Sequence, residues 1–449
     1  MFDPERYDSA TGRFGAVVVA LLAIASSITG ILNGFAYDDT VIIIEDPRFR
    51  SLQSLWQVFT RTYWMPQYGG SLYRPLTTLG FRLEWIVGGG SPLPFHIVSI
   101  LMYAAVSVAV FGLARQLFDN TSAFVSAALF AVHPLHVEAV ANAVGQAELG
   151  AALCVVTAMS LYIRWSRSSG IDWRRRSLLC ALFLCGLMFK EHAIVLPGLI
   201  VAAEILAINS GATFNERTRR LLPLLIPLSL TAVAFVAIRT SVIGTIAGGG
   251  PEATVFLHQP FSVRLLTMIP VVLEWIRLFV WPANLSADYS APRIEVLHSF
   301  TIAMVPAIAV IIACTGIAVQ MRKQYPTAAF AFAWTGIALL IPSNLIVVTG
   351  VALAERTLFL PSVGVAMLLG GGLVALARSA SPSFQRGVAY GVALLLVAGI
   401  ARSSTRNPVW RNDETLFRQT VDDVPNSSKA HEMLGNVLMT KGKHAEGIL

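Results

Sequence analysis

The chain has 449 residues, of which 55% are hydrophobic and only 13% are charged, and its formal net charge is +7. A soluble domain carries roughly 25% charged residues, so this composition excludes a soluble enzyme and indicates a polytopic membrane protein whose apolar surface faces lipid. Because no basic run is interleaved with aromatic residues, the positive charge is attributed to arginines kept on the cytoplasmic side, and no nucleic-acid partner is expected.

Apolar runs recur along the chain, and most approach the ~20 residues that a helix needs to cross a hydrocarbon core. The expected membrane spans are residues 14–34, 95–114, 121–134, 148–163, 177–189, 192–208, 221–239, 300–320, 327–345, 358–377 and 387–402. A further run, residues 265–281, is expected to lie in the membrane interface, because it carries Glu274 and Arg277 and because a crossing would move later arginines outside. The predicted fold class is an all-α polytopic bundle of about 11 transmembrane helices.

Arginine-rich loops orient this bundle. With the amino terminus in the cytoplasm, the cytoplasmic loops are rich in arginine, at residues 164–176, 217–220, 322–323 and 378–386, and the opposite short loops nearly lack it. The carboxyl terminus is then external. The preference for arginine over lysine and the abundant alanine favour a bacterial inner membrane over the endoplasmic reticulum.

The same topology places a set of acidic, histidine and basic side chains at the external ends of spans or in external loops. This external set consists of Asp38, Asp39, Arg74, His133, His136, Glu138, Glu148, Lys190, Glu191, His192, Asp288, Glu355 and Arg356. Ionisable groups near membrane depth are costly unless they pair or line a wet cavity, so their concentration on one face indicates a functional site. The four cysteines lie inside apolar segments, which indicates neither a disulfide framework nor a thiolate metal site.

The first external loop, residues 36–94, opens with two adjacent carboxylates, Asp38 and Asp39. Adjacent acids disfavour each other's ionisation, so the pair suits a general base or a cation site, and a pair of solvated loop acids is the alternative. Tryptophans and tyrosines further along predict interfacial helices on either side of Arg74. The guanidinium of Arg74 suits a phosphate, whereas an arginine that only reaches the headgroups is the competing interpretation.

Three polar residues follow the third span: His133, His136 and Glu138. Their spacing suggests zinc, but Pro134 interrupts the helix and no further ligand is near in the sequence. The favoured interpretation is that these polar side chains pair with their neighbours.

Two pairs of charged residues begin later spans. Lys190 and Glu191 stand in a very short turn, where the lysine can neutralise a lipid phosphate or pair internally with Glu191 or Glu138. Glu355 and Arg356 stand at the mouth of the tenth span. Arg356 is the preferred phosphate ligand by position, and a buried pair with Glu355 is the alternative.

Residues 405–449 are polar with a helical pattern, and residues 1–404 are expected to form the membrane domain. Small residues at Ala430, Gly435 and Ala445 follow the spacing of a tetratricopeptide repeat, in which they let two antiparallel helices approach. A single repeat cannot bury its face alone, so we expect that a longer array has been truncated.

Several short motifs now combine into a resemblance. They are Tyr37-Asp-Asp39, Tyr73-Arg-Pro-Leu76, His133-Pro-Leu-His-Val-Glu-Ala139, Lys190-Glu191, Leu285-Ser-Ala-Asp-Tyr-Ser290 and Ala354-Glu-Arg-Thr-Leu-Phe-Leu-Pro-Ser362. In this order, and followed by the start of a repeat, they resemble the transmembrane and tetratricopeptide-repeat O-mannosyltransferase family. The chain has Arg-Thr-Leu-Phe where the family more usually has Arg-Tyr-Leu-Tyr, and it has almost no repeat array, which leaves acceptor selection open.

The resemblance implies a fold similar to the GT-C glycosyltransferases, with the site in the first external loop. It also implies an inverting transfer of a sugar, mannose in the family, from a polyprenyl-phosphate donor to a protein serine or threonine hydroxyl on the external or lumenal face. The expected partners are this lipid-linked sugar, an acceptor protein or peptide, and membrane lipid. No cofactor is required.

The chemistry of such a transfer assigns roles to the candidate residues. Asp39 or Asp38 would accept the acceptor's proton, with Asp39 slightly preferred, and a divalent cation, if used, would bind the same pair. The side chains expected to stabilise the departing phosphate are Arg356, Arg74 and Lys190. The residues expected to support the site or to bind the acceptor are His133, His136, Glu138, Glu191 and Glu355.

Two other classes of protein remain as alternatives. A transporter or lipid translocator would use membrane-embedded charges along a permeation route, so charges spread through the middle of spans would favour it. A membrane-anchored interaction scaffold would act through its repeats. Removing residues 405–449 is expected to destroy a scaffold and to leave a transferase in the bundle chemically intact.

Overall fold

Helices account for the regular structure of the computed structural model, which describes residues 10–51, 55–168, 170–209, 211–245, 255–256 and 258–447. No β-strand occurs in these ranges. The α-helices are α1 (Ala10–Ser27), α2 (Pro75–Gly88), α3 (Leu93–Leu117), α4 (Asn120–Ala131), α5 (Val137–Ala141), α6 (Gln146–Arg167), α7 (Trp173–Phe189), α8 (Leu196–Ala203), α9 (Phe214–Ile243), α10 (Phe261–Val280), α11 (Met304–Gln324), α12 (Pro326–Leu339), α13 (Phe359–Arg378), α14 (Pro382–Arg406), α15 (Asp413–Asp423), α16 (Ser428–Thr440) and α17 (His444–Gly447). The predicted all-α fold class is confirmed.

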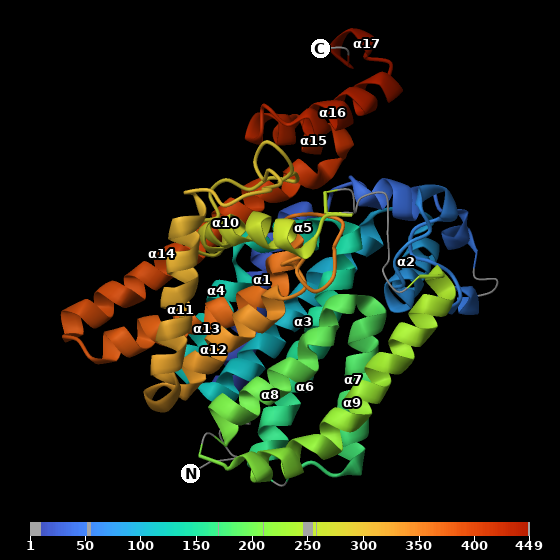
Figure 1. Cartoon of the computed structure of the whole chain (residues 1–449). Coiled ribbons are helices and arrows are strands. Elements are labelled where there is room, and N and C mark those ends of the chain that lie inside the picture. Colours follow the sequence, from blue (N-terminus) through green and yellow to red (C-terminus); the bar gives the residue numbers. More distant parts are fainter. Residues whose placement is uncertain are drawn as a thin grey trace.

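Most of these helices stand side by side in one bundle (Figure 1). In the described residues, eight helices are long and apolar enough to cross a membrane, and a ninth crossing is counted if Asn120–Ala131 and Pro134–Ala141 form one bent span. The chain is therefore an integral, multi-pass membrane protein. A helix lies at each of the eleven predicted spans, but α7 has 17 residues and α12 has 14, so both are short for a full crossing.

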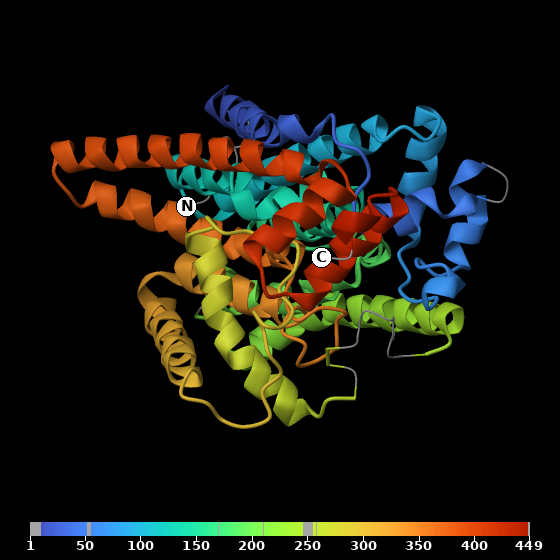
Figure 2. The same ribbon diagram turned by 90° about the horizontal axis from the view of Figure 1, so that it is seen from above.

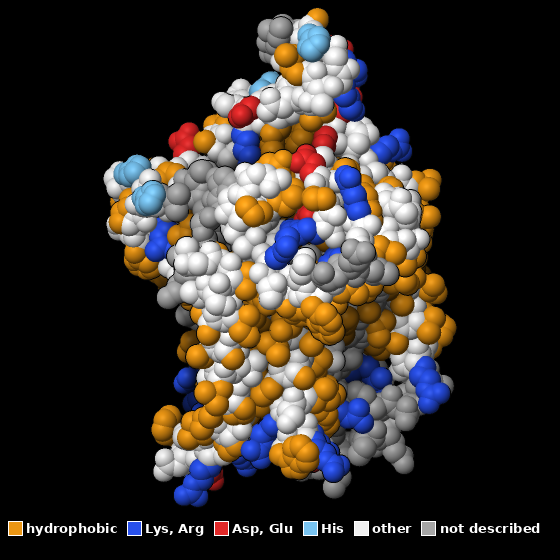
Figure 3. All heavy atoms as spheres, turned by 90° about the vertical axis from the view of Figure 1, so that its right-hand side faces the viewer, with side chains coloured by type: hydrophobic (Ala, Val, Ile, Leu, Met, Phe, Trp, Pro, Cys, Tyr) orange, Lys and Arg blue, Asp and Glu red, His pale blue; other side chains and the backbone are white. Residues whose placement is uncertain are grey.

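The outer faces of the bundle are apolar. Figure 3 shows hydrophobic side chains over the middle of one side of the molecule, with lysine and arginine gathered toward its lower end. Only 11% of the most apolar part of α11 and 6% of that of α14 is buried within the protein. Surface of this kind is what the hydrocarbon of a bilayer covers.

Helix α10 lies across one end of the bundle rather than along it (Figure 1) and is not among the candidate spans of the described residues. Glu274 on this helix pairs with Arg277 at 2.7 Å and with Arg293 at 2.8 Å, while Trp281 at its end is exposed. These features agree with the prediction that residues 265–281 do not cross the membrane, and their location in the interface stays a prediction.

The first external loop is folded by short 3-10 and π turns that precede α2. Phe49, Phe81 and Phe95 are fully or almost fully buried in one apolar cluster, which joins the loop to α2 and α3. Asp46 begins a turn by accepting a hydrogen bond from the backbone N–H of Arg48 at 2.9 Å. The loop is thus held by its own core and can position side chains beside the bundle.

The carboxyl-terminal helices α15, α16 and α17 lie at the same end of the bundle as α2, α5 and α10, over its middle when seen from above (Figures 1 and 2). Trp410 and Leu416 of this segment are buried. A Cβ at Gly435 of α16 would lie 3.1 Å from the Gly447 carbonyl of α17, so the two helices approach closely at a small residue. Assignment of this segment to a truncated tetratricopeptide repeat stays a prediction.

Helix α13 lies deep in the bundle because small residues let its neighbours approach. A Cβ at Gly364 would collide with Thr335 and with the Ala331 carbonyl of α12, and a Cβ at Gly370 would collide with the backbone nitrogen and hydroxyl of Ser126 on α4. Helix α13 directly follows the turn Glu355–Leu358, so these contacts help to fix that turn.

We expect Gly370→Ala to lower the thermal unfolding temperature of the detergent-purified protein by several degrees, because forced overpacking costs about 1–3 kcal/mol. The matched control is Gly372→Ala on the same helix, where an added Cβ meets nothing within 4 Å. In the control, the better helix propensity of alanine should leave stability equal or higher. Equal unfolding temperatures for the two variants would contradict the close approach of α4 and α13.

Candidate active site

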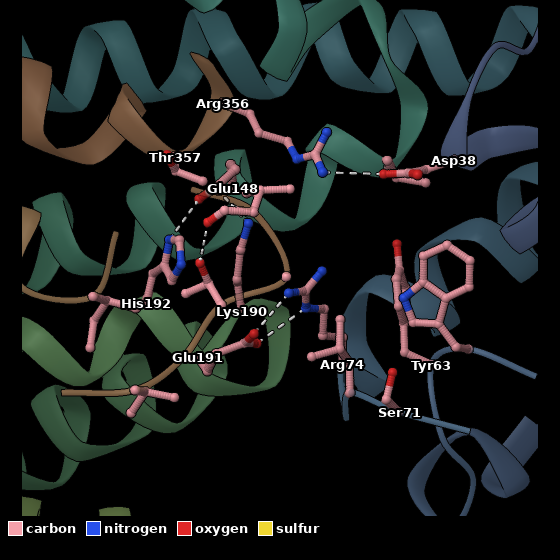
Figure 4. Close-up of a pocket in the computed structure, with 18 of the residues that line it drawn as sticks. Asp38, Tyr63, Ser71, Arg74, Glu148, Lys190, Glu191, His192, Arg356 and Thr357 are labelled. Atoms are coloured by element: carbon pink, nitrogen blue, oxygen red, sulfur yellow. Dashed lines mark hydrogen bonds and ion pairs between the residues drawn. The ribbon is translucent and has the colours of Figure 1, made fainter. Parts of the chain in front are cut away.

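A pocket opens between the loop predicted to be the first external one (residues 36–94), the start of α6, the α7–α8 turn and the segment before α13 (Figure 4). Its volume is about 1170 Å³ when the open space at its mouth is counted. Its charged lining consists of the cations Arg74, Lys190, Arg239 and Arg356 and the carboxylates Asp38, Glu148 and Glu191. The pocket therefore has more basic than acidic side chains, which favours an anionic ligand.

Arg356 and Asp38 form an ion pair at one wall of this pocket, with Nη2 and Oδ2 3.3 Å apart. Glu138, on α5, fixes the arginine from behind: it accepts hydrogen bonds from the Arg356 backbone N–H at 2.8 Å and from Nη1 at 2.6 Å. Only 14% of the Arg356 side chain and 8% of the Asp38 side chain are exposed. Asp38 is thus a carboxylate held in the pocket wall by a guanidinium.

Asp39 occupies a different position from Asp38. Its carboxylate accepts hydrogen bonds from the backbone N–H groups of Ala143 at 3.0 Å and Val144 at 2.8 Å, just before α6. Burial raises the pKa of Asp39 to about 8, against the effect of these two bonds, and the neighbouring charge of Asp38 raises it further. Asp39 does not line the pocket, so its side chain fastens the loop to α6 while Asp38 faces the ligand space.

Lys190 reaches into the pocket from the extended residue that ends α7. Its ammonium forms a buried ion pair with Glu148 in the first turn of α6, and His192 Nδ1 lies 3.4 Å from the other oxygen of that carboxylate. Burial lowers the pKa of Lys190, and the charge of Glu148 opposes this shift. The sequence had suggested Glu191 or Glu138 as partners of Lys190, and Glu148 takes that position instead.

Arg74 enters from the opposite side, at the residue before Pro75 begins α2. Its guanidinium makes a two-point contact with Glu191, with Nη2–Oε1 at 2.8 Å and Nε–Oε2 at 3.2 Å, and its Cζ lies 5.2 Å from the centre of the Tyr63 ring. Burial is the largest single effect and lowers the pKa of Arg74, but the charge and the hydrogen bond of Glu191, together with the charge of Glu148, raise the pKa above its ordinary value. Arg74 therefore keeps its positive charge in the pocket.

His133 and His136 lie outside the pocket lining. His133 Nε2 is 2.9 Å from the Phe279 carbonyl, and His136 lies between the Tyr103 hydroxyl and the Ser362 hydroxyl, each at 2.9 Å. Glu138 is paired with Arg356. The three side chains whose spacing suggested zinc therefore contact different groups. Each one pairs with a neighbour, as the favoured interpretation of this motif expected.

Glu355 also lies outside the pocket lining and does not pair with Arg356. Its carboxylate accepts hydrogen bonds from the Ser286 backbone N–H at 2.6 Å and from the Tyr289 hydroxyl at 2.7 Å. Glu355 thus ties the segment after α10 to the turn that carries Arg356. The alternative of a buried Glu355–Arg356 pair is wrong.

Of the predicted site residues, the pocket brings together Asp38, Arg74, Lys190, Glu191 and Arg356. Sequence reasoning missed other lining residues. These are Tyr63, Glu148, His192, Arg239 and Thr357. Glu148 and His192 had been placed in the external set without a role, whereas Arg239 gave a usable signal, because a cation at the end of an apolar span is a functional hypothesis by default.

We expect Glu148→Gln to destabilise the protein strongly, because removing one partner of a buried ion pair costs about 3–5 kcal/mol. The double variant Glu148→Gln/Lys190→Met should unfold at a higher temperature than Glu148→Gln alone, since no unpaired ammonium then remains. Thermal unfolding in detergent micelles checks this. If the double variant lost as much stability as the two single variants lose in sum, the buried ion pair would be contradicted.

The chain is similar to several known proteins. The family model described as dolichyl-phosphate-mannose-protein mannosyltransferase matches residues 76–238. The chain is similar to the protein O-mannosyl-transferase Tmtc3 of Drosophila melanogaster, with 26% identity over 93% of this chain and 52% of that protein. It is also similar to the protein O-mannosyl-transferase F38B6.6 of Caenorhabditis elegans, with 27% identity over 98% of this chain and 63% of that protein.

A third relative is the human protein O-mannosyl-transferase TMTC4, with 26% identity over 96% of this chain and 64% of that protein. The resemblance drawn from the motifs is confirmed. The chain spans between 52% and 64% of the length of these three relatives. All three are animal proteins, and they lend no support to a bacterial membrane.

Two solved structures share the fold at 13% sequence identity. ArnT from Cupriavidus metallidurans, bound to undecaprenyl phosphate, matches with a TM-score of 0.52 over 98% of this chain and 74% of that one. The archaeal oligosaccharyltransferase AglB from Archaeoglobus fulgidus, in complex with an inhibitory peptide and a dolichol-phosphate, matches with a TM-score of 0.51 over 89% of this chain and 56% of that one. The predicted GT-C-like fold is confirmed.

Proposed function

We propose that this chain is an inverting glycosyltransferase that moves mannose from a polyprenyl-phosphate donor to a serine or threonine hydroxyl of a protein. The observation that carries the proposal is the Asp38–Arg356 pair in the wall of a pocket that also holds Arg74 and Lys190. A carboxylate for the acceptor and cations for a phosphate are the two things that such a transfer needs in one place.

The named relatives support the same reaction class. The three similar curated proteins carry the name protein O-mannosyl-transferase. The two structural neighbours hold undecaprenyl phosphate and dolichol-phosphate, and one also holds a peptide. A lipid-linked donor and a polypeptide acceptor are therefore the substrates to test on this chain.

The geometry favours Asp38 over Asp39 as the general base. Asp38 lines the pocket, whereas both oxygens of Asp39 are occupied by backbone N–H groups. In the proposed step the acceptor oxygen attacks the anomeric carbon of mannose and its proton passes to Asp38. The bond from that carbon to the phosphate oxygen breaks, and the lipid phosphate leaves with the electron pair, so the anomeric configuration inverts.

The basic side chains would act on the departing phosphate. The leaving phosphate gains negative charge as the bond breaks, so a cation beside it stabilises the transition state more than the ground state. Arg356 is fixed on two atoms by Glu138, and Arg74 is fixed on two atoms by Glu191. Charges held in this way need little reorganisation during the reaction.

The donor set at Asp38 and Asp39 does not fit a divalent cation well. A cation needs several free oxygen ligands, but Asp39 is occupied by backbone donors and Asp38 faces Arg356. No group of three or more histidine, cysteine, aspartate or glutamate side chains in the described ranges could hold a metal ion. The proposed mechanism therefore uses the protein's own side chains.

The position of the pocket charges helps to distinguish a transferase from a transporter, and it indicates which side of the membrane the pocket faces. The α6–α7 and α8–α9 connections lie at the end of the bundle opposite α2 and α5, near which the pocket lies (Figure 1), and the arginine-rich segments 164–176 and 217–220 overlap or adjoin these connections. Charges gathered at one end favour a transferase over a permeation route. By the positive-inside rule the pocket would face away from the cytoplasm.

We expect Asp38→Asn to lower mannosyl transfer by about 10²–10⁴-fold, because an amide cannot accept the hydroxyl proton. The assay uses the purified full chain in nanodiscs with a radiolabelled polyprenyl-phosphate mannose and candidate peptides. Asp39→Asn is the matched control: its amide would direct N–H groups at a backbone donor, so stability should fall. Transfer by Asp38→Asn at the wild-type rate would rule out Asp38 as the base.

We also expect a polyprenyl phosphate without sugar to raise the unfolding temperature, since a ligand at 100 times its Kd stabilises by about 2.7 kcal/mol. Arg356→Gln should reduce this shift at the same ligand concentration. Arg322→Gln, at the exposed end of α11, should leave the shift unchanged. An equal shift in all three proteins would exclude Arg356 from the phosphate site.

A further inference from the structure

Asp413, the first residue of α15, contacts the segment that carries the two adjacent acids. Its Oδ1 accepts a hydrogen bond from the Tyr37 backbone N–H at 2.5 Å, and its Oδ2 accepts one from the Thr40 hydroxyl at 3.3 Å. One carboxylate therefore bridges both ends of Tyr37–Thr40, and Asp38 lies between the two contacts. We refer to residues 36–44 as the acid loop.

The backbone of the acid loop needs such a support. Tyr37 has a φ of 59°, in the left-handed region, where a residue other than glycine is strained and stays only when its surroundings hold it. The hydrogen bond to Asp413 is made by the N–H of this same residue. The Tyr37 ring also packs edge-on against Phe417 of α15, with ring centroids 5.9 Å apart.

An apolar cluster extends the contact to α5, the helix that supports Arg356. Ala36 of the acid loop, Trp410 and Phe417 of the carboxyl-terminal segment, and Val137 and Ala141 of α5 are buried together. Helix α5 carries the glutamate that fixes the pocket arginine. The carboxyl-terminal segment thus packs at once on the element with the proposed base and on the element that supports its cationic partner.

A second set of polar contacts joins the same segment to the turn of Arg356. Ser427 donates a hydrogen bond to Asp288 at 2.7 Å, in the segment whose Ser286 and Tyr289 hold Glu355. Glu355 immediately precedes Arg356 in the chain. Both partners of the Asp38–Arg356 pair are therefore connected to α15 and α16 through short chains of contacts.

We propose that Asp413 is a positioning residue for sugar transfer, and that α15 holds the acid loop so that Asp38 pairs with Arg356 in the pocket wall. This inference rests on the proposed function for its catalytic consequence. It reverses the expectation that removing residues 405–449 leaves the transferase intact, because that removal would take away the partners of Tyr37, Thr40 and Asp288.

The test compares four full-length proteins in nanodiscs: wild type, Asp413→Ala, Asp413→Asn and Glu414→Ala. Asparagine can still accept from the Tyr37 N–H and place its amide toward the Thr40 hydroxyl, so it should rescue the loss. Glu414 is the matched control, because it is an acid in the same first turn of α15 but contacts Arg418, Lys441 and Lys443 rather than the acid loop.

We expect Asp413→Ala to lower kcat by about tenfold to a hundredfold, as a displacement of about 1 Å at a reacting group can do, with the donor KM nearly unchanged. Amide exchange of the acid loop should become faster in this variant only. Wild-type kcat, or acid-loop exchange at the wild-type rate, in Asp413→Ala would overturn the inference, as would an equal loss in Glu414→Ala.

The exchange measurement separates this inference from the proposed function. If wild type transfers no mannose from a polyprenyl-phosphate donor, the proposed function fails. Unchanged acid-loop exchange in Asp413→Ala would then still overturn the role of Asp413. Faster exchange in Asp413→Ala, with a wild-type exchange rate in Asp413→Asn, would still support that role.

Discussion

The pocket depends on the pairing of charges that cannot remain alone at its depth. Glu138 holds Arg356 by two hydrogen bonds, and the same guanidinium reaches Asp38. An isolated charge in such a place would cost several kcal/mol or would neutralise. Each element that enters the pocket therefore brings a partner for a charge on another element, and the ion pairs determine how the first external loop, α5 and the segment before α13 meet.

Much of this arrangement could be predicted from the sequence. Composition and apolar runs predicted the helical membrane fold. The side of the membrane required for the later arginines predicted that residues 265–281 do not cross, and α10 is not among the candidate spans of the described residues. The short motifs brought Asp38, Arg74, Lys190, Glu191 and Arg356 to one end of the bundle, where the pocket lies. These predictions succeeded because the membrane restricts backbone structure and makes ionisable residues conspicuous.

The partners of these residues could not be predicted, because they are set by packing between distant segments. Nothing in the order of two adjacent acids shows that Asp39 accepts from backbone N–H groups about a hundred residues later while Asp38 faces the pocket. In the same way, Lys190 pairs with Glu148 rather than with its sequence neighbour.

The location of α15–α17 at the same end of the bundle as α2 and α5 has a consequence for substrate encounter (Figure 1). A polypeptide that bound these helices would be tethered to the enzyme, and its hydroxyl groups would meet the donor as an intramolecular event rather than by free diffusion. Tethers of short reach give effective concentrations in the millimolar range. Weak intrinsic affinity of the pocket for a serine or threonine would then be no obstacle to turnover, and the choice of acceptor would follow from which chains can be captured within that reach.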